Sequence, residues 1–285
     1  MSEIILSGVG YSYGKKTPYE TKALDNVSVT IARGKITGII GHTGSGKSTL
    51  VQMLNGLIEP DKGKVKIDLQ DIWENRKDIR KYRFKVGLVM QYPEYQLFEE
   101  TIRKDIAFGP RNMGLSEEEI AERVLEAARF VELDESLLEK SPFELSGGQK
   151  RRAAIAGIIA MRPDVLVLDE PAAGLDPRGR ASIFKNISDY REKTGKTVVI
   201  VSHSMEDVAR YCDELIVMSA ARVLMCGTPD KVFSQPEILV KNGLDIPQIA
   251  HLNMLLRQKG IDLGDGIYTV EGAFERILEK RKITH

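Results

Sequence analysis

The chain has 285 residues, and its 41 basic residues balance its 41 acidic ones. Balanced charge gives no electrostatic reason to expect nucleic acid as a partner. The two cysteines, Cys212 and Cys226, lack the spacing of metal ligands, which suits a reducing cytosolic setting. No apolar run approaches the roughly 18 residues of a membrane span, so any membrane association is expected to come through a partner protein.

The first clear strand signal is the alternating segment 27–31. A short apolar run, 35–40, is predicted to be the next strand, and residues 48–55 are predicted to be a helix. Between them stand Gly41, His42, Thr43, Gly44, Ser45, Gly46, Lys47 and Ser48, followed by Thr49. This string fits the phosphate-binding P-loop pattern, and a strand before it and a helix after it are the context that such a match requires.

A P-loop binds phosphate for physical reasons. Its glycines let several backbone N–H groups converge on one point, and the following helix adds its positive N-terminal end. We expect Lys47 to reach the β- and γ-phosphates of a nucleotide and the Ser48 hydroxyl to ligate Mg²⁺. His42 occupies a variable position of the pattern, where the backbone rather than the side chain does the binding.

Polar residues end two further predicted strands. Gln91 follows the strand 86–90, and the apolar strand 165–168 runs into Asp169 and Glu170, which is the Walker B pattern. Successive strand residues point to opposite sides, so the two carboxylates can serve different purposes. Asp169 is expected to hold Mg²⁺, and Glu170 is expected to activate the attacking water as a general base.

From about residue 97 to 160 the pattern is helical, with a capping box at Ser116 and Glu119. This segment contains the string Leu145, Ser146, Gly147, Gly148 and Gln149. Ser146 and the glycine N–H groups can donate to a phosphate at a helix N-terminus. The alternative is an ordinary helix start with Ser146 as the N-cap.

Further strands are predicted at 197–201 and 214–218, and helices separate most of the strands. This alternation indicates an α/β fold with a mostly parallel sheet and helices on its faces. We predict a P-loop NTPase core in residues 1–225, with an N-terminal antiparallel β portion and an inserted helical subdomain at about 97–160. Residues 226–285 are expected to form a small helical accessory region, whose last helix spans 269–281.

In this order, the P-loop, Gln91, the string 145–149 and the Walker B strand closely resemble the ATP-binding cassette proteins. The resemblance covers residues 1 to about 225 and implies ATP and Mg²⁺ as cofactors. It implies that the string 145–149, the family's signature, binds the γ-phosphate of an ATP held by the P-loop of a second subunit. Two ATP molecules then lie in the seam of a head-to-tail dimer.

The resemblance also assigns roles to single residues. It implies that Gln91 contacts Mg²⁺ and the attacking water, and that His203 is the switch residue that contacts the γ-phosphate. Asp176 matches the D-loop that crosses the dimer seam. An aromatic side chain before the first clear strand stacks on adenine, and Tyr13 fits that position better than Tyr11.

Several local strings resemble one branch, the ATPase subunits of energy-coupling factor transporters, and specifically the second of their two paralogues. These strings are residues 91–101, 105–110, 141–144 and 202–207. The resemblance implies a peripheral protein on the cytoplasmic face of the cell membrane that drives uptake of vitamins or transition-metal ions. Its expected partners are a second cassette ATPase, identical or paralogous, a transmembrane coupling protein that docks close to Gln91, and a substrate-binding membrane subunit.

The accessory region 226–285 is similar to that branch, where it helps to hold the ATPase pair together. One departure is the string Ser219, Ala220 and Ala221, which lacks a glycine often found in this turn. A non-transport cassette ATPase of translation or DNA maintenance is disfavoured, because the chain has one cassette and no coiled-coil insertion. The ATPase of another transporter class is disfavoured by residues 91–101 and by the C-terminal region.

Overall fold

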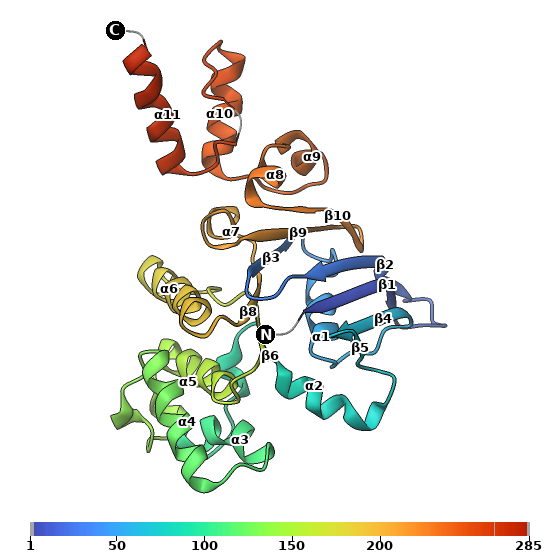
Figure 1. The fold of residues 1–285 in the computed structure, drawn as a ribbon, viewed down its shortest axis with the longest axis vertical. Coiled ribbons are helices and arrows are strands. Elements are labelled where there is room, and N and C mark those ends of the chain that lie inside the picture. The colour runs from blue at the N-terminus through green and yellow to red at the C-terminus, as the bar shows by residue number, and fades with distance from the viewer. Residues whose placement is uncertain (1–2, 265, 284–285) are drawn as a thin grey trace.

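Two β-sheets with helices around them make up the described residues, 3–264 and 266–283, of the computed structural model (Figure 1). The strands are β1 (Ile4–Tyr13), β2 (Thr21–Ile31), β3 (Ile36–Gly41), β4 (Lys62–Ile67), β5 (Gln70–Asp71), β6 (Val86–Val89), β7 (Val165–Asp169), β8 (Thr197–Val201), β9 (Glu214–Ser219) and β10 (Arg222–Gly227). The helices are α1 (Lys47–Leu54), α2 (Ile79–Lys85), α3 (Ile102–Asn112), α4 (Glu117–Phe130), α5 (Gly147–Ile159), α6 (Pro177–Thr194), α7 (Met205–Tyr211), α8 (Pro229–Phe233), α9 (Pro236–Lys241), α10 (Gln248–Gln258) and α11 (Val270–Ile283). Short 3₁₀ turns are η1 (Arg76–Asp78), η2 (Pro93–Gln96), η3 (Glu135–Leu137) and η4 (Pro142–Glu144).

The larger sheet has the strand order β10-β9-β3-β8-β7-β6, and all its neighbours pair in parallel except β9 with β10. Every residue of β3, β6, β7 and β8 is buried, which explains why these strands are continuous apolar runs rather than alternating ones. The predicted parallel α/β core is therefore confirmed. Because the strands are parallel, the segments that follow β3, β6, β7 and β8 all leave the sheet at one edge.

The smaller sheet is antiparallel, with the order β2-β1-β4-β5, and packs across the first sheet to enclose a second apolar core. Its strand β1 was missed by the sequence prediction, which placed the first clear strand at 27–31. The reason is local: register shifts near Gly8 and Gly10 interrupt the alternation of β1. Tyr11 and Tyr13 therefore lie within a strand.

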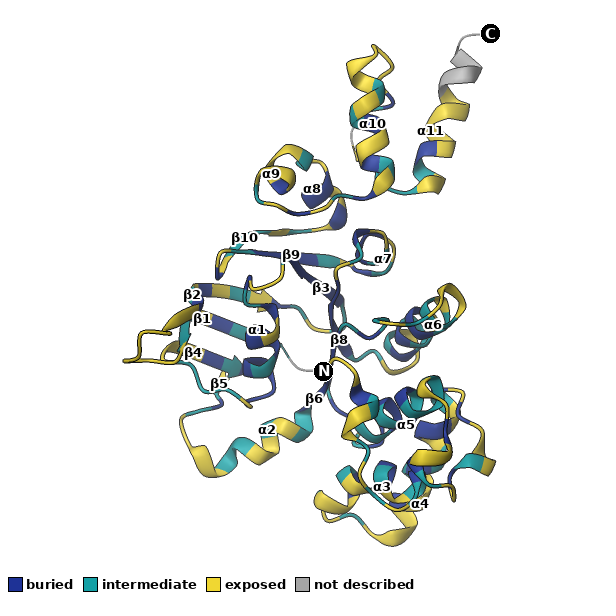
Figure 2. Ribbon diagram, turned by 180° about the vertical axis from the view of Figure 1, so that it is seen from behind, coloured by how far each residue is buried: buried dark blue, intermediate teal, exposed yellow. Residues whose placement is uncertain are grey.

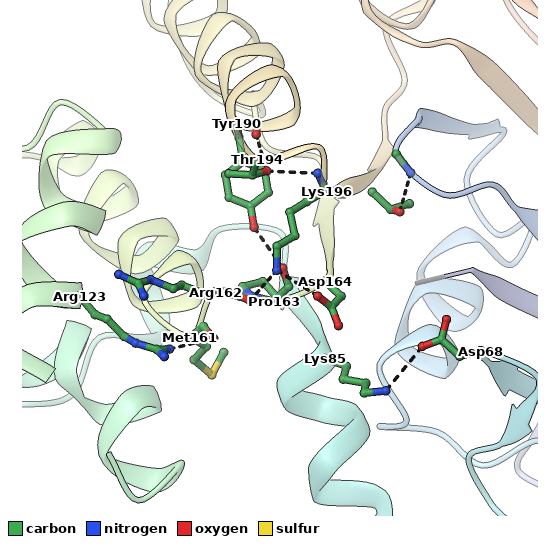
Figure 3. Close-up of polar contacts among 12 residues, drawn as sticks. Asp68, Lys85, Arg123, Met161, Arg162, Pro163, Asp164, Tyr190, Thr194 and Lys196 are labelled. Atoms are coloured by element: carbon green, nitrogen blue, oxygen red, sulfur yellow. Dashed lines mark hydrogen bonds and ion pairs between the residues drawn. The ribbon is translucent and has the colours of Figure 1, made fainter. Parts of the chain in front are cut away.

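Helices α3, α4 and α5 lie between β6 and β7 in the chain and pack on one another beside the larger sheet (Figure 1). The predicted capping box at the start of α4 is present, with Ser116 and Glu119 bonding each other's backbone N–H. The link from α5 to β7 is tied to the sheet by Lys196, whose Nζ donates to the Arg162 carbonyl and to Asp164, each at 3.0 Å (Figure 3). The buried Tyr190 hydroxyl donates to the Pro163 carbonyl in the same link.

The C-terminal helices α8 to α11 follow β10: α8 packs against β9 and β10, whereas α10 and α11 extend away from the sheets (Figure 2). Helices α10 and α11 are largely exposed, and a small apolar cluster around Leu263, Ile267 and Ala273 holds them together. The last helix was predicted at 269–281 and spans Val270–Ile283, so its existence is confirmed and its end lies two residues further on.

The tight turn between β9 and β10 places two alanines in a left-handed conformation, with φ of +46° at Ala220 and +64° at Ala221. Residues with a Cβ pay roughly 1 kcal/mol or more for this conformation, and such turns prefer Asn-Gly. Ala220 is exposed, so we expect Ala220→Gly to raise the free energy of unfolding by about 0.5–1 kcal/mol. Thermal unfolding measures this change.

The matched control for this prediction is Ala181→Gly, at an exposed position within α6. There glycine is a worse helix former than alanine, so stability should fall by about 1 kcal/mol. A lower melting temperature for both variants would contradict the strain argument at Ala220.

Candidate nucleotide-binding site

A cavity of about 430 Å³ opens at the sheet edge where β3, β6, β7 and β8 end. Its walls contain most of the residues that the sequence singled out, from five separate segments. These are Tyr13, Thr43, Gly44, Gly46, Lys47, Ser48, Thr49, Gln91, Asp169, Glu170 and His203. Parallel strand order is what assembles them, since the register pairs Val89 of β6 with Leu168 of β7 and Asp169 with Val201 of β8.

The P-loop takes a shape that side chains would prevent. Gly46 is the N-cap of α1 with φ of +103°, and a Cβ there would lie 2.3 Å from the Ala23 carbonyl oxygen. A Cβ on Gly41 would lie 2.4 Å from the Met218 carbonyl oxygen of β9. Close packing of the loop between the two sheets thus requires glycine at both positions, and it aims the α1 N-terminus into the cavity.

Lys47 is largely buried at the base of this loop. Its Nζ donates to the carbonyl oxygens of Gly41, at 2.7 Å, and His42, at 3.0 Å. Burial lowers the pKa of Lys47, while the nearby carboxylates of Glu170 and Asp169 oppose that shift. The ammonium group is held at the cavity wall with two of its three donors engaged, so it can turn toward an anion with little rearrangement.

The Asp169 carboxylate and the Ser48 hydroxyl lie together at the end of β7. Burial raises the pKa of Asp169, and a hydrogen bond with Ser48 partly offsets the rise. Hard oxygen ligands of this kind suit Mg²⁺, which is typically bound through one or two carboxylates and fills its octahedron with water and phosphate oxygens. Within residues 3–264 and 266–283, no group of three or more His, Cys, Asp or Glu is arranged to hold a metal. Ser48, Gln91 and Asp169 line the same cavity, and each has a side-chain oxygen of the kind that Mg²⁺ accepts as a ligand.

Glu170 sits directly after β7 in a left-handed backbone conformation, with φ of +52°, and its N–H donates to the Val201 carbonyl. Burial first, and then the charge of Asp169, raise the pKa of Glu170 to about 7. A pKa near the working pH is what an efficient general base requires. The His203 Nε2 lies 3.3 Å from the Glu170 Oε1, and burial lowers the pKa of His203, so the imidazole is neutral at pH 7.

Tyr13 lines the mouth of the cavity beside the α1 helix, and its hydroxyl lies 3.2 Å from the Thr49 hydroxyl. Tyr11 packs edge-to-face against Tyr13, with ring centroids 4.9 Å apart, and does not line the cavity. Thr21, Lys22, Ala23 and Val201 also line the cavity, although no sequence pattern predicts them as site residues. They carry no motif, because they reach the site only through the packing of β2 against the P-loop and the pairing of β8.

The structure leaves other predicted residues outside this cavity. Gly41, His42 and Ser45 belong to the loop without lining the cavity, and the His42 Nδ1 contacts the Thr43 carbonyl at 2.8 Å. Ser146 caps α5: its hydroxyl accepts from the Gln149 N–H, and the Gln149 side chain accepts from the Ser146 N–H. Gly147 and Gly148 form the first turn of α5, and Asp176 caps α6 by accepting from the Gly179 N–H.

Comparison with known proteins agrees with this geometry. The family model described as ABC transporter matches residues 24–173. The chain is 52% identical to the protein named energy-coupling factor transporter ATP-binding protein EcfA2 of Caldanaerobacter subterraneus, over 96% of each chain. It is also 52% identical to the protein of the same name from Clostridium acetobutylicum, again over 96% of each chain.

Solved structures resemble the fold as well. The chain matches cbiO1 from Clostridium perfringens, described as part of the ABC transporter complex cbiONQ, with a TM-score of 0.74 and 40% identity over 87% of this chain and 97% of that one. It matches the dimeric ATP-binding cassette MJ0796, bound to ADP and Pi, with a TM-score of 0.72 and 30% identity over 79% and 98%. The P-loop cavity, the Walker B pair and these relatives together show that the chain is an ABC ATPase of the energy-coupling factor transporter ATP-binding family.

Proposed function

We propose that this chain is the ATP-hydrolysing subunit of an energy-coupling factor importer for vitamins or transition-metal ions, peripheral on the cytoplasmic face of the cell membrane. The observation that carries the proposal is the single cavity in which Lys47, Asp169, Glu170 and His203 meet. Lys47 binds the phosphates, and Asp169 with Ser48 and Gln91 holds Mg²⁺ when it is bound, which neutralises phosphate charge. Glu170 takes a proton from the attacking water, and neutral His203 contacts the γ-phosphate.

A groove beside the nucleotide cavity supports a membrane partner. It encloses about 470 Å³ between α2, β6 and the helices α3 and α5, and its walls are largely apolar. Phe98 and Phe108 line it edge-to-face, 5.0 Å apart, although they are 65% and 43% exposed. Exposed aromatic side chains around a groove are typical of a site that takes an amphipathic helix. We assign this groove to a cytoplasmic helix of the transmembrane coupling protein.

Two features support a cassette dimer. The signature residues Ser146, Gly147, Gly148 and Gln149 lie outside this chain's own nucleotide cavity, so they are available to the ATP of a second ATPase. Asp176 also lies outside this cavity, and we expect it at the seam of the dimer. On α11, Val270, Phe274, Ile277 and Leu278 share one face and are exposed. An apolar stripe on the outer helix of residues 226–285 fits a contact that holds the ATPase pair together.

No helix in the part of the chain that the structure describes is both long and apolar enough to cross a membrane. The proposal is tested by purifying the tagged chain from detergent-solubilised membranes and identifying the proteins that copurify with it. We expect a second cassette ATPase, a multi-helix coupling protein and a small substrate-binding membrane protein. Recovery of ribosomes or DNA in their place would contradict the proposal.

The groove assignment has its own test. Phe98→Asp places a charge among apolar walls and should abolish recovery of the coupling protein while leaving ATP binding intact. Leu69→Asp is the matched control, because Leu69 is 73% exposed on the turn between β4 and β5, away from the groove. Equal recovery of the coupling protein with wild type and Phe98→Asp would remove the groove from the proposal.

Tyr13 is expected to stack on the adenine of ATP. Removing a ring that stacks on a base typically costs 1–3 kcal/mol, so Tyr13→Ala should raise the KM for ATP roughly tenfold. Tyr13→Phe keeps the ring and should stay close to wild type, which separates stacking from the contact of the Tyr13 hydroxyl with Thr49. If Tyr11→Ala raises KM and Tyr13→Ala does not, the adenine position belongs to Tyr11.

A further inference from the structure

Arg151 is a buried basic residue on α5, two residues beyond the signature string. Its side chain is 4% exposed, so the guanidinium lies away from water. A guanidinium stays charged at any physiological pH, and it offers its donors in a rigid fork. Burying a guanidinium is favourable only where fixed hydrogen-bond acceptors face its donors. The acceptors of Arg151 therefore show which segments of the chain it connects.

One acceptor is the carboxylate of Glu94. The Arg151 Nε lies 3.0 Å from Oε2, and Nη2 lies 2.9 Å from Oε1, which is the bidentate arrangement. Glu94 belongs to η2, three residues after Gln91, and its side chain is 16% exposed. The segment 91–98 lines the nucleotide cavity at Gln91 and the apolar groove at its other end, with Glu94 between the two.

The other acceptors follow the catalytic base. The Arg151 Nη1 donates to the Ala173 carbonyl at 2.5 Å and lies 3.4 Å from the Pro171 carbonyl. The Ala173 N–H in turn donates to the Glu170 carbonyl at 3.1 Å. These bonds close a tight turn that begins at Glu170, whose left-handed backbone is held on the other side by the bond of its N–H to the Val201 carbonyl.

We propose that Arg151 is a positioning residue for ATP hydrolysis, which holds Glu170 in place through the turn 171–173. The same guanidinium is also bonded to Glu94 of η2, which lies on the wall of the groove. A shift of η2 would therefore move Arg151 and, through the turn 171–173, Glu170. The inference rests on the proposed hydrolytic function of this site. Loss of the Arg151 hydrogen bonds that hold Glu170 in place should slow the chemical step and leave the P-loop contacts to ATP unchanged.

The test is steady-state ATP hydrolysis by the assembled transporter with Arg151→Lys. Lysine keeps the charge and loses the fork, so we expect kcat to fall at least tenfold while the KM for ATP stays within twofold. Wild-type kcat in this variant would overturn the inference. Absence of hydrolysis by the wild-type complex in the same assay would instead overturn the proposed function.

Glu94→Gln is the second variant, which keeps the shape of the pair and removes the carboxylate charge. It should lower kcat and leave the KM for ATP unchanged. The double variant, Arg151→Lys with Glu94→Gln, should be no slower than Arg151→Lys alone, because both changes disrupt the same Arg151–Glu94 interaction. Independent, multiplying effects would show two separate structural roles and contradict the inference. Glu94→Gln carries the test if Arg151→Lys fails to fold.

Lys196→Gln is the matched control. The Lys196 Nζ also donates to one carboxylate, that of Asp164, and to one backbone carbonyl, that of Arg162, but at the opposite end of β7 (Figure 3). This variant should lower the melting temperature and leave kcat within twofold of wild type. An equal loss of kcat in Lys196→Gln and Arg151→Lys would mean that loosening α5 and β7 anywhere slows hydrolysis, and the specific role of Arg151 would be wrong.

Discussion

Glu170→Gln should slow steady-state ATP hydrolysis by about 10²–10⁴-fold while ATP still binds. The amide has the size of the carboxylate but takes no proton, so the attacking water loses its base. The Lys47 ammonium and the P-loop backbone are untouched, and phosphate contacts remain. We therefore expect ATP to accumulate in a closed dimer, seen as phosphate release that stops and as an ATP-dependent shift in size-exclusion chromatography.

The environment of Glu170 is the reason for expecting so large an effect. Burial and Asp169 raise its pKa to about 7, so the carboxylate accepts a proton far more readily than an ordinary exposed acid. Glu192→Gln, on the exposed surface of α6, is the control and should hydrolyse ATP at the wild-type rate. Normal turnover by Glu170→Gln would refute its assignment as the base.

Lys47→Ala should weaken ATP binding by about 10- to 100-fold, because a hydrogen bond to a charged group contributes about 1.5–3 kcal/mol. In the described structure the ammonium is already held at the cavity by the carbonyls of Gly41 and His42, so it meets the phosphates with little loss of entropy. Titration calorimetry with ATP measures the change.

Lys193→Ala is the control for this prediction, since Lys193 is exposed near the end of α6. The thermal stability of Lys47→Ala without nucleotide should be measured as well, because the carbonyls of Gly41 and His42 lose a donor. Unchanged ATP affinity in a folded Lys47→Ala protein would count against the P-loop assignment.

Much of the site can be predicted from short sequence strings, because each motif consists of residues that are contiguous or nearly contiguous in the chain. The strand predicted at 35–40 and the helix predicted at 48–55 need no distant partner to be recognised, and they are observed as β3 (Ile36–Gly41) and α1 (Lys47–Leu54). The predicted capping box at Ser116 likewise involves residues three apart, and it is present. Buried parallel strands are recognisable as apolar runs, so the predicted strands 165–168 and 197–201 match β7 and β8 to within one residue.

Other features could not be read from the chain, because they depend on residues far apart. The local alternation of β1 is too irregular to identify a strand, so its pairing with β2 and with β4, the latter more than 50 residues further along the chain, defines it. Thr21, Lys22 and Ala23 enter the nucleotide cavity only because β2 packs against the P-loop.

By itself, then, the sequence determined the chemistry: a P-loop, a Walker B pair, a signature and the helices and strands that carry them, all recognisable from patterns within a few residues. Tertiary structure decided the geometry: which strand ends meet at one edge, the burial that raises the pKa of Glu170, and the join between Arg151, Glu94 and the turn after the base. The physical reason is that burial and long-range hydrogen bonds come from packing between segments, and no local pattern of residues records which segments will meet.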